Sequence, residues 1–335
     1  MFAKKMSRNY KKFKAVVIGA GRIAALFDKP GSRTVLTHAH AFQRNPRIEL
    51  VGFYDIDFDK AHVAAERWST RAFKNFEQLY AAVQPDIVSI CTPNSHHYST
   101  LVQVAELKPR LVITEKPLTT NLVDSKKIIN LYQKKKIPVL VNYSRRFDSS
   151  VQKLKTELHS GRYGQVLGAT GVYSKGVLHN GSHLIDLTRY LFGEVIGAKA
   201  LFGRSDYQDP ADSAVGGFLS FDHCQQFYLV AADERCYSIF ELDILCERGR
   251  IRFTDSGLVV TEEQPIFDPL YKGYTILGKA KCQPTHLAGA LVALVDNAVH
   301  YLEKKQPLLS TLANAYETQR VCSILLTQSK KIKYV

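Results

Sequence analysis

Lys116 is the residue whose place in the sequence says most about chemistry. It stands in the segment Thr114-Glu115-Lys116-Pro117, which closes the apolar run Leu111-Val112-Ile113. The run predicts a buried strand, and the proline fixes the backbone that presents the lysine. Because ligands of open α/β sheets bind outside the carboxyl ends of the strands, this lysine is well placed to hydrogen-bond a reacting oxygen and transfer a proton. A Glu-Lys pair on its own is more often an ordinary surface feature, so the surrounding sequence has to decide.

A second group with chemical potential lies further along the chain and contains two histidines and an aspartate. If a helix begins near Asn180 or Ser182, His183 and Asp186 are three residues apart and share one face of it. A hydrogen-bonded interface histidine is the ordinary alternative for His183. His179 and His183 also have a spacing that zinc ligands can have, but two histidines without a third ligand are weak evidence. We therefore predict no metal site.

The elements that would position these residues begin with the apolar run Ala15-Val16-Val17-Ile18, which predicts a first strand. A glycine turn and an apolar helical pattern follow without a gap, in the order Gly19-Ala20-Gly21-Arg22-Ile23-Ala24. Gly19 permits a tight turn, and Gly21 lets the backbone approach a pyrophosphate at the N-terminus of the helix. Ala24 stands where a third glycine often stands and is small enough for close packing. The segment predicts a dinucleotide-binding turn, with a tight turn that binds nothing as the alternative.

An acidic residue follows the next expected strand. The strand is Ile48-Glu49-Leu50-Val51-Gly52-Phe53-Tyr54, and Asp55 ends it. A carboxylate at this point accepts hydrogen bonds from the adenosine ribose hydroxyls, which favours NAD over NADP. Arg22 weakens that preference, since an arginine can meet a 2′-phosphate, and NADP stays possible. The spacing from the glycines to Asp55 is longer than usual, which we attribute to a loop around residues 28–33 that either covers the cofactor or decorates the edge of the sheet.

A third buried strand, over residues 86–90, ends in small polar residues. It leads through Cys91 into Thr92-Pro93-Asn94-Ser95-His96-His97, where Thr92 and Asn94 can hydrogen-bond a cofactor across the strand ends. The alternative for the two histidines is a solvated helix start. Helices are then expected near residues 99–107 and 122–135, with a strand at 137–142. This alternation predicts a mainly parallel, doubly wound sheet.

The second half of the sequence has a different pattern, because strands follow one another instead of alternating with helices. Helices are expected over about residues 148–161 and from 180 or 182 to 193, with a strand at 166–173 between them. Strand-like runs then recur near residues 196–202, 216–221, 226–231, 238–245, 250–253 and 258–261, before a late helix near 286–302. Such a run of strands predicts a separate sheet. We therefore expect two domains, residues 12–143 and 144–335.

Taken together, the ordered motifs resemble the Gfo/Idh/MocA oxidoreductases over nearly the whole chain. The motifs are Gly19-Ala20-Gly21-Arg22-Ile23-Ala24, Cys91-Thr92-Pro93-Asn94-Ser95-His96-His97, Glu115-Lys116-Pro117, Val141-Asn142-Tyr143-Ser144-Arg145-Arg146-Phe147 and Gly181-Ser182-His183-Leu184-Ile185-Asp186-Leu187. The resemblance implies an N-terminal Rossmann domain and a C-terminal α/β domain with an open, mostly antiparallel sheet for substrate binding and oligomerisation. It also implies one nicotinamide cofactor, a homodimer or homotetramer, and often a sugar, sugar-nucleotide or cyclitol substrate.

The resemblance also implies roles for particular residues. His183 corresponds to the family's histidine near the substrate, which makes it the expected acid/base residue with Lys116 as helper or alternative. Asp186 would orient His183 or hold the substrate, and the cofactor would exchange a hydride with a substrate carbinol carbon. The expected cofactor-binding residues are Gly19, Ala20, Gly21, Arg22, Ile23, Asp55, Thr92, Pro93, Asn94, His97, Glu115, Lys116 and Asn142. The expected substrate-binding residues are Lys116, Tyr143, Arg145, Asn180 and His183, with interdomain ion pairs as the alternative for Arg145 and Arg146.

One position departs from the family pattern. Many members have an aspartate four residues before the histidine, and this sequence has His179 there. Either His179 takes a substrate-binding role, or Lys116 and His183 do the acid/base work alone, or activity is lost. We keep His179 and Asp186 in the candidate catalytic set with Lys116 and His183. The alternative is a non-catalytic protein that binds NAD(H) as a sensor or assembly partner, against which the retention of Lys116 and His183 argues.

Composition sets milder bounds. The 335 residues are 45% hydrophobic, enough for two packed domains, and the six cysteines form no Cys-x-x-Cys pair, which favours a reducing cytosol. We find no apolar stretch long enough for a membrane helix and no signal peptide, so we expect a cytoplasmic protein without a membrane partner. The net charge of +14 is concentrated at the N-terminus and at residues 134–136 and 330–333, without a nucleic-acid reader motif. It indicates either a solvated basic surface or attraction of an anionic substrate such as a nucleotide sugar or sugar acid, and we expect no nucleic-acid partner.

Overall fold

The computed structural model describes residues 11–204 and 212–332, and the chain divides into two compact units. The first unit comprises residues 1–115, 127–142 and 291–309, and the second comprises residues 116–126, 143–290 and 310–335. A single division after residue 143 does not reproduce these units, because one segment before that point and one after it belong to the other unit. Of the basic clusters, Lys4, Lys5, Arg8 and Lys333 lie outside the described residues.

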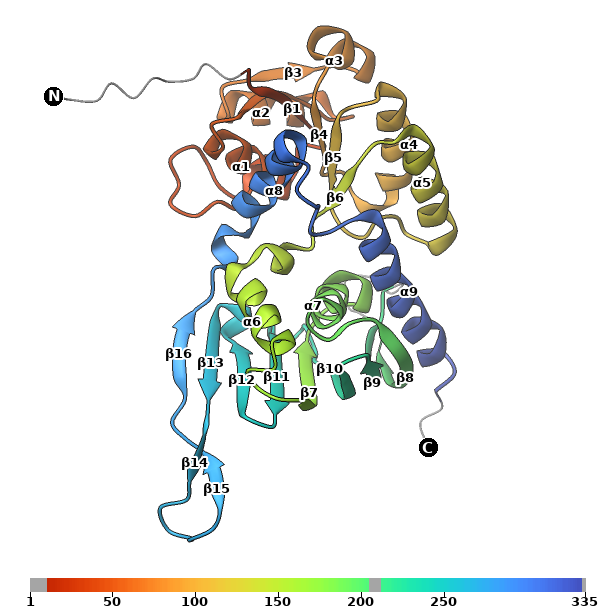
Figure 1. The fold of residues 1–335 in the computed structure, drawn as a ribbon. Helices are drawn as coiled ribbons and strands as arrows, with labels where there is room; N and C mark the ends of the chain where they lie inside the picture. The colour runs from red at the N-terminus through yellow and green to blue at the C-terminus, as the bar shows by residue number, and fades with distance from the viewer. Residues whose placement is uncertain (1–10, 205–211, 333–335) are drawn as a thin grey trace, which may run out of the picture. The chain divides into compact units, whose positions relative to one another are not determined.

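The first unit is built on a six-stranded parallel sheet, which confirms the predicted doubly wound architecture (Figure 1). The strand order β3-β2-β1-β4-β5-β6 reverses direction between β1 and β4, so the carboxyl ends of these two strands flank a topological switch point. β4 and β5 are buried along their whole length, as a sheet covered on both faces requires. The strands are β1 Phe13–Ile18, β2 Ile48–Tyr54, β3 Arg71–Phe73, β4 Ile87–Ile90, β5 Leu111–Thr114 and β6 Val139–Val141.

Three helices of this unit, α4, α5 and α8, lie near positions that the sequence pattern predicts, and α1 was not predicted. α4 begins two residues before its expected start, after the short 3-10 helix η2 Asn94–His96. Our sequence analysis did not predict the elements α2, β3 and α3 between residues 58 and 83. The helices are α1 His38–Arg44, α2 Phe58–Arg67, α3 Phe76–Val83, α4 His97–Leu107 and α8 Ala290–Lys304, with α5 Leu122–Lys135 divided between the two units.

The structure shows how short the helix expected after the glycine turn is. Only a five-residue π-helix, η1 Arg22–Leu26, follows the turn, and α1 begins after a loop. The reason is the buried carboxylate of Asp28, which accepts a hydrogen bond from Thr37 Oγ1 (2.6 Å) and contacts the His40 ring nitrogen Nδ1 (2.8 Å). These contacts anchor the loop predicted around residues 28–33. The extra residues before Asp55 therefore form a fixed part of this unit.

The second unit contains the separate sheet that the run of strands predicted. Its eight strands have the order β16-β13-β12-β11-β7-β10-β9-β8, and among the described residues every neighbouring pair is antiparallel except β7 and β10 (Figure 1). This confirms the expected mostly antiparallel sheet. The strands are β7 Val166–Tyr173, β8 Val195–Arg204, β9 Ala214–Phe221, β10 Cys224–Ala231, β11 Phe240–Cys246, β12 Gly249–Thr254, β13 Val259–Glu263 and β16 Lys281–Pro284.

Helices of the second unit pack against this sheet and against one another. The apolar side of α7 approaches β7 so closely that a Cβ at Gly171 would lie 2.7 Å from atoms of Leu184 and Phe227. A larger residue at that position would force the Leu184 and Phe227 side chains to shift. α9 contacts both α7 and β8, and we did not predict it from the sequence. The helices are α6 Ser149–His159, α7 Ser182–Phe192 and α9 Leu312–Ser329, and the short turns are η3 Ser144–Phe147, η4 Val177–Gly181, η5 Asp255–Gly257 and η6 Leu287–Gly289.

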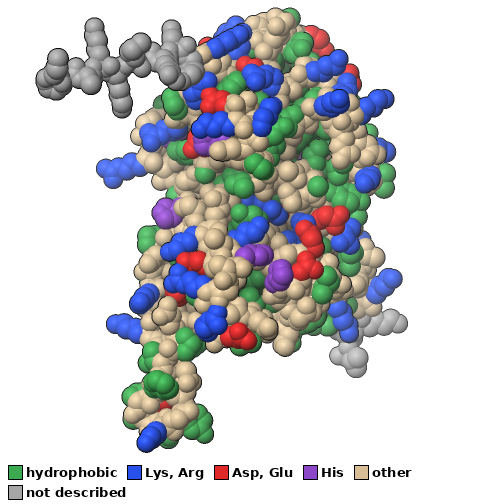
Figure 2. Space-filling model, in the orientation of Figure 1, with side chains coloured by type: hydrophobic (Ala, Val, Ile, Leu, Met, Phe, Trp, Pro, Cys, Tyr) green, Lys and Arg blue, Asp and Glu red, His purple; other side chains and the backbone are tan. Residues whose placement is uncertain are grey.

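A hairpin of β14 Pro265–Phe267 and β15 Thr275–Leu277 projects from the second unit (Figure 1). Hydrophobic side chains gather on it in Figure 2, and Phe267 is 87% exposed. On the face drawn in Figure 2, Lys and Arg side chains are spread widely instead of forming one patch. None of the helices in the described ranges is both long and apolar enough to cross a membrane. All six cysteines are free.

Candidate active site

The glycine turn after β1 is tightly packed at Gly19 and has free space beside Gly21. Gly19 has φ +89°, and a Cβ there would lie 2.7 Å from the carbonyl group of Cys91, so the position accepts only glycine. A Cβ at Gly21 would meet no described atom within 4 Å. An open backbone turn after the first strand is what the close approach of a pyrophosphate requires.

Asp55 is fixed against this turn. Its Oδ2 atom accepts a hydrogen bond from Ala20 N (2.7 Å), and its Oδ1 atom accepts one from Asp57 N (3.0 Å). The Ala20 amide is therefore used within the protein, and the half-buried carboxylate lies beside the turn. Arg22 is exposed and Ile23 is half-buried on η1. Because η1 is so short, its dipole contributes little, and the open backbone at the turn matters more for anion binding.

Two buried oxygens at the carboxyl ends of β4 and β6 have no hydrogen-bond partner within the described ranges. They are Thr92 Oγ1 and Asn142 Oδ1. A buried oxygen without a partner costs about 1–3 kcal/mol, so a polar ligand that supplied donors here would be stabilised. Together with the open turn at Gly21, these oxygens fit a bound dinucleotide. Pro93 and Asn94 are exposed beside Thr92 and belong to the same strand end.

His96 and His97 have different surroundings. His96 is exposed, as a solvated helix start predicts. His97 is buried, and its ring Nε2 donates to the Thr92 carbonyl oxygen (3.0 Å). A solvated position is therefore wrong for His97, which supports the backbone that carries Thr92.

His38, which our sequence analysis did not identify, lies at the centre of a buried polar network in the first unit. Its Nε2 donates to Glu115 Oε1 (2.9 Å), and its Nδ1 lies 2.9 Å from Ser89 Oγ. Asn142 Nδ2 donates to the same Glu115 oxygen (2.6 Å). Burial by itself lowers the pKa of His38, but Cys91 and the Glu115 carboxylate oppose this effect and raise the pKa to about 10. His38 is therefore protonated at pH 7 and balances the carboxylate that directly precedes Lys116.

Lys116 belongs to the second unit, where it contacts the π-helix η4. Its Nζ donates a hydrogen bond to the His179 carbonyl oxygen (3.0 Å). The buried carboxylate of Asp212 accepts hydrogen bonds from the His179 amide (2.9 Å) and the amide before it, which holds η4 in place. The structure thus brings Lys116 to the backbone of His179, whereas the His179 side chain is exposed and Asn180 is half-buried.

His183 lies near the start of α7 in the same unit. Its ring contacts the buried ring of Tyr143 edge-on, with centroids 5.7 Å apart. Its Nδ1 is buried and, among the described residues, has no hydrogen-bond partner. Burial lowers the pKa of His183 well below its ordinary value, and the charges of Lys116, Arg145 and His179 lower it further. The ring is therefore neutral at pH 7, and a ring nitrogen can accept a proton.

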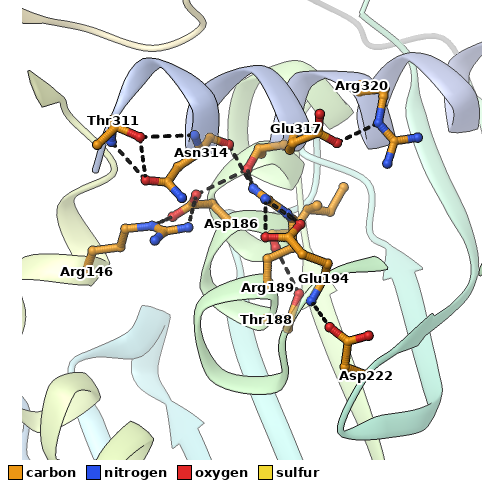
Figure 3. A network of polar contacts seen from close by, with 12 residues as sticks. Arg146, Asp186, Thr188, Arg189, Glu194, Asp222, Thr311, Asn314, Glu317 and Arg320 are labelled. Carbon is orange, nitrogen blue, oxygen red and sulfur yellow. Dashed lines mark hydrogen bonds and ion pairs between the residues drawn. The ribbon is translucent and has the colours of Figure 1, made fainter. Parts of the chain in front are cut away.

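Asp186 has its described contacts away from His183. Its carboxylate accepts two hydrogen bonds from Arg146, at 2.7 and 2.8 Å, and one from Thr318 Oγ1 at 3.1 Å. Figure 3 shows this pair in a larger polar network that joins α7 to α9. The role predicted for Asp186, to orient His183 or hold the substrate, stays a prediction. The described contacts of Asp186 tie α7, η3 and α9 together within the second unit.

Arg145, next in the chain to Arg146, has no such carboxylate. Its guanidinium carbon lies 3.4 Å from the centre of the Phe240 ring. Tyr143, Arg145 and His183 therefore come from two neighbouring elements of one unit. Their predicted role in substrate binding stays a prediction.

These features together define a nucleotide-binding Rossmann domain. They are a parallel sheet, an open glycine turn, an acidic residue after the second strand, and buried oxygens without a hydrogen-bond donor among the described residues. Residues 13–143 match the model of the Gfo/Idh/MocA oxidoreductase family, described as an NAD-binding Rossmann fold. Over this domain, which is less than half of the chain, the chain is similar to the Gfo/Idh/MocA family. The match confirms the family resemblance and NAD as the cofactor of this domain.

Curated relatives match parts of the chain. The D-glucoside 3-dehydrogenase of Escherichia coli is 25% identical over an alignment that covers 60% of this chain and 64% of the relative. An inositol 2-dehydrogenase of Rhodococcus jostii is 35% identical over 36% of each chain. The D-apiose dehydrogenase of Paraburkholderia graminis is 24% identical over 62% of this chain and 55% of the relative. The chain thus spans less than two thirds of these relatives.

Solved structures resemble nearly the whole chain. An oxidoreductase from Agrobacterium radiobacter in complex with NAD+, L-tartaric acid and magnesium superposes with a TM-score of 0.78, at 17% identity, over 96% of this chain and 97% of that one. A dehydrogenase from Bordetella pertussis in complex with NADH and UDP-GlcNAcA superposes with a TM-score of 0.76, at 17% identity and the same coverage. At this identity the likeness shows the fold of both units.

Proposed function

We propose that the protein is an NAD(P)-dependent oxidoreductase that transfers a hydride reversibly at a secondary alcohol of a sugar, a sugar nucleotide or a cyclitol. The observation that carries the proposal is that one unit holds a lysine, Lys116, and a half-buried, neutral histidine, His183, whose Nδ1 atom is buried. The names of the relatives, which include glucoside and inositol dehydrogenases, support this range of substrates.

His183 would accept the proton of the substrate hydroxyl. A neutral imidazole is the form that can do so, and its buried Nδ1 has no competing partner among the described residues. The positive charges of Lys116 and Arg145 disfavour the protonated ring, so the proton is readily returned when the reaction runs in reverse. The same side chain thus serves as base in oxidation and as acid in reduction.

Lys116 would hydrogen-bond the reacting oxygen. An ammonium group stabilises the negative charge that develops on that oxygen as its proton leaves, and it polarises the carbonyl in the reverse direction. Its hydrogen bond to the η4 backbone at His179 positions the long side chain. Lys116 is therefore expected to act mainly on turnover.

The residues of the first unit would hold the cofactor. Gly21 offers the open turn, Asp55 the carboxylate for the ribose, and Thr92 and Asn142 the buried oxygens that need donors. When bound, NAD supplies the hydride acceptor. The negative charge of Glu115 is neutralised by protonated His38, so the residue before Lys116 contributes no net charge there.

We also propose that the protein forms the expected homo-oligomer through the open face of the eight-stranded sheet. Phe227 points to the α7 side of this sheet. Tyr228 and Val230 alternate with buried residues on the opposite face and are 49% and 45% exposed. Apolar side chains on an open sheet face are typical of an interaction surface. A cytoplasmic location remains our expectation from the sequence.

The decisive test is Lys116→Ala, assayed with NAD against a panel of sugars, cyclitols and sugar nucleotides. We expect kcat on an accepted substrate to fall by about 10²–10⁴-fold, because the reacting oxygen loses its charged donor. NADH formation followed by absorbance measures the rate, and NADH titration measures cofactor binding, which should stay within about twofold of wild type.

The matched variant is Asp55→Ala, which should weaken NAD binding and leave the acid/base residues in place. A wild-type protein that binds NADH but oxidises nothing in the panel would favour the non-catalytic sensor. Equal loss of NADH binding in the two variants would contradict the division of roles between Lys116 and Asp55.

A further inference from the structure

Two adjacent arginines of η3 have very different environments. Arg146 gives two hydrogen bonds to the buried Asp186 carboxylate, which balances its charge. The Arg145 side chain forms no hydrogen bond and no ion pair with any residue in the described ranges, and its guanidinium carbon lies 3.4 Å from the centre of the Phe240 ring. The stacking supports the flat group but leaves its in-plane N–H donors without acceptors.

The charge of Arg145 is only weakly opposed. Asp148 is the carboxylate that favours its charged form, but Asp148 already accepts hydrogen bonds from Ser150 N (2.8 Å) and His286 N (3.1 Å). Burial prevails and lowers the pKa of Arg145 to about 9, so the group is charged at pH 7 but poorly solvated. A partly buried cation with unused donors is stabilised by an anion from outside the chain.

On one side of the Arg145 guanidinium the neighbouring residue is a glycine, which has no side chain to fill the adjacent space. Gly257 of η5 borders it, and a Cβ at that position would lie 4.0 Å from Arg145 Nε and 3.7 Å from the Phe240 ring. Gly257 has φ +83°, a conformation that favours glycine. A larger side chain would restrict access to the guanidinium from this side.

The groups that act electrostatically on His183 are all basic. They are Lys116, Arg145 and His179, and no carboxylate is among them. The acids around them have other partners, since Asp186 binds Arg146 and Asp212 binds backbone amides of η4. A neutral sugar would leave this excess of positive charge unbalanced.

Building on the proposed function, we propose that Arg145 recognises a carboxylate of the substrate, so that the protein acts on sugar acids. The planar fork of a guanidinium matches the two oxygens of a carboxylate and donates two parallel hydrogen bonds to them. Phe240 would hold the plane of the fork, and Gly257 would leave room for the acid. Arg145 is thus a specificity-determining residue.

Such binding would also prepare His183. A carboxylate at Arg145 cancels part of the positive field that disfavours the protonated ring, so the basicity of His183 rises when the acid is bound. A neutral sugar would bind without this effect. The inference therefore predicts selectivity in turnover as well as in binding.

The test compares acid and neutral sugars of the same stereochemistry, D-glucuronate with D-glucose and D-galacturonate with D-galactose. Calorimetry on the NADH-loaded protein should show at least one acid binding about 30-fold or more tighter than its neutral partner, the effect of a buried charge pair. Arg145→Gln should reduce this preference to under about threefold, mainly by weakening binding of the acid, while NADH binding stays unchanged. Arg145→Lys should retain part of it, because the charge remains and the fork is lost.

Arg320→Gln, which removes a positive charge from the outer side of α9, is the matched control and should preserve the preference. The inference is overturned if neither acid binds, if neither binds more tightly than its neutral partner, or if the preference survives Arg145→Gln. UDP-glucose, which carries phosphates and no carboxylate, is titrated in the same way. The inference is also overturned if UDP-glucose is the only one of these ligands whose binding depends on Arg145. If an acid binds tightly but the protein forms no NADH with it, the proposed function is overturned and carboxylate recognition by Arg145 stands. If the protein oxidises neutral sugars alone, the proposed function stands and carboxylate recognition is overturned.

Discussion

His38 in the first unit is a buried histidine and His183 in the second is half-buried with a buried Nδ1 atom, and their surroundings drive their protonation in opposite directions. His38 donates to the Glu115 carboxylate and its pKa rises to about 10. His183 faces the positive charges of Lys116 and Arg145 and its pKa falls well below the ordinary value. The first histidine is therefore a charged structural partner, and the second is neutral, which is the form that the base in our proposal must have.

The difference teaches that burial alone does not decide the protonation of such a histidine. Burial is the largest single cause at both residues and lowers the pKa of each, but at His38 the combined effects of Cys91 and the Glu115 carboxylate outweigh it. The ring nitrogens of His38 both have partners, Glu115 and Ser89. His183 keeps a buried Nδ1 without a partner among the described residues, as a group that exchanges a proton with a ligand requires.

Replacing each histidine with glutamine should give the largest contrast. We expect His183→Gln to lower kcat by about 10²–10⁴-fold, because the proton acceptor is lost, with little change in the free energy of unfolding. The corresponding His38→Gln variant should retain kcat within about tenfold, since its effect on chemistry is indirect. Steady-state rates with an accepted sugar measure both.

Similar losses of kcat in the two variants would break the comparison. Recovery of activity in His183→Gln at high pH, where the substrate hydroxyl loses its proton more readily, would sharpen it. Such recovery would show that the missing function is a base.

Much of the fold and part of the candidate site follow from local sequence. The apolar run before Thr114 and the proline after Lys116 place that lysine at a strand end without further information. The same reasoning failed for His38, whose partners Ser89 and Glu115 lie 51 and 77 residues away and meet it only through the strand order. It also left the same alternative, an interdomain ion pair, open for Arg145 and Arg146, because adjacent arginines look the same until their acids are located.

Tertiary contacts also explain the local errors. A helical pattern continues past the glycine turn in the sequence, but the buried Asp28 anchors a loop there through Thr37 and His40. Nothing in the local pattern distinguishes this aspartate from one on a surface. The hairpin β14–β15 was missed because its strands are three residues long and exposed, without the alternation that marks a half-buried strand.

After the loss of kcat, the second predicted contrast between the two histidines concerns the free energy of unfolding. We expect His38→Gln to reduce the free energy of unfolding by about 1–3 kcal/mol, because the partly buried Glu115 carboxylate loses its charged donor. His183→Gln should change it by less than about 1 kcal/mol, since no described hydrogen bond of Nδ1 is lost. Urea titration followed by fluorescence gives both values, and a larger loss in His183→Gln would contradict the contrast.

The last effect is the pH dependence of stability, where the two histidines should act in separate pH windows. For His38 the folded pKa of about 10 lies above the ordinary 6.5, so its stabilisation is complete below pH 6.5 and is lost as the pH rises toward 10. For His183 the folded pKa lies below 6.5, so the unfolded chain takes up the proton first and stability falls as the pH drops below 6.5. Each limb is limited to about 1.4 kcal/mol per pH unit. His38→Gln should flatten only the alkaline limb and His183→Gln only the acid limb in urea titrations across pH, and a limb that survives its own substitution would assign the proton to another group.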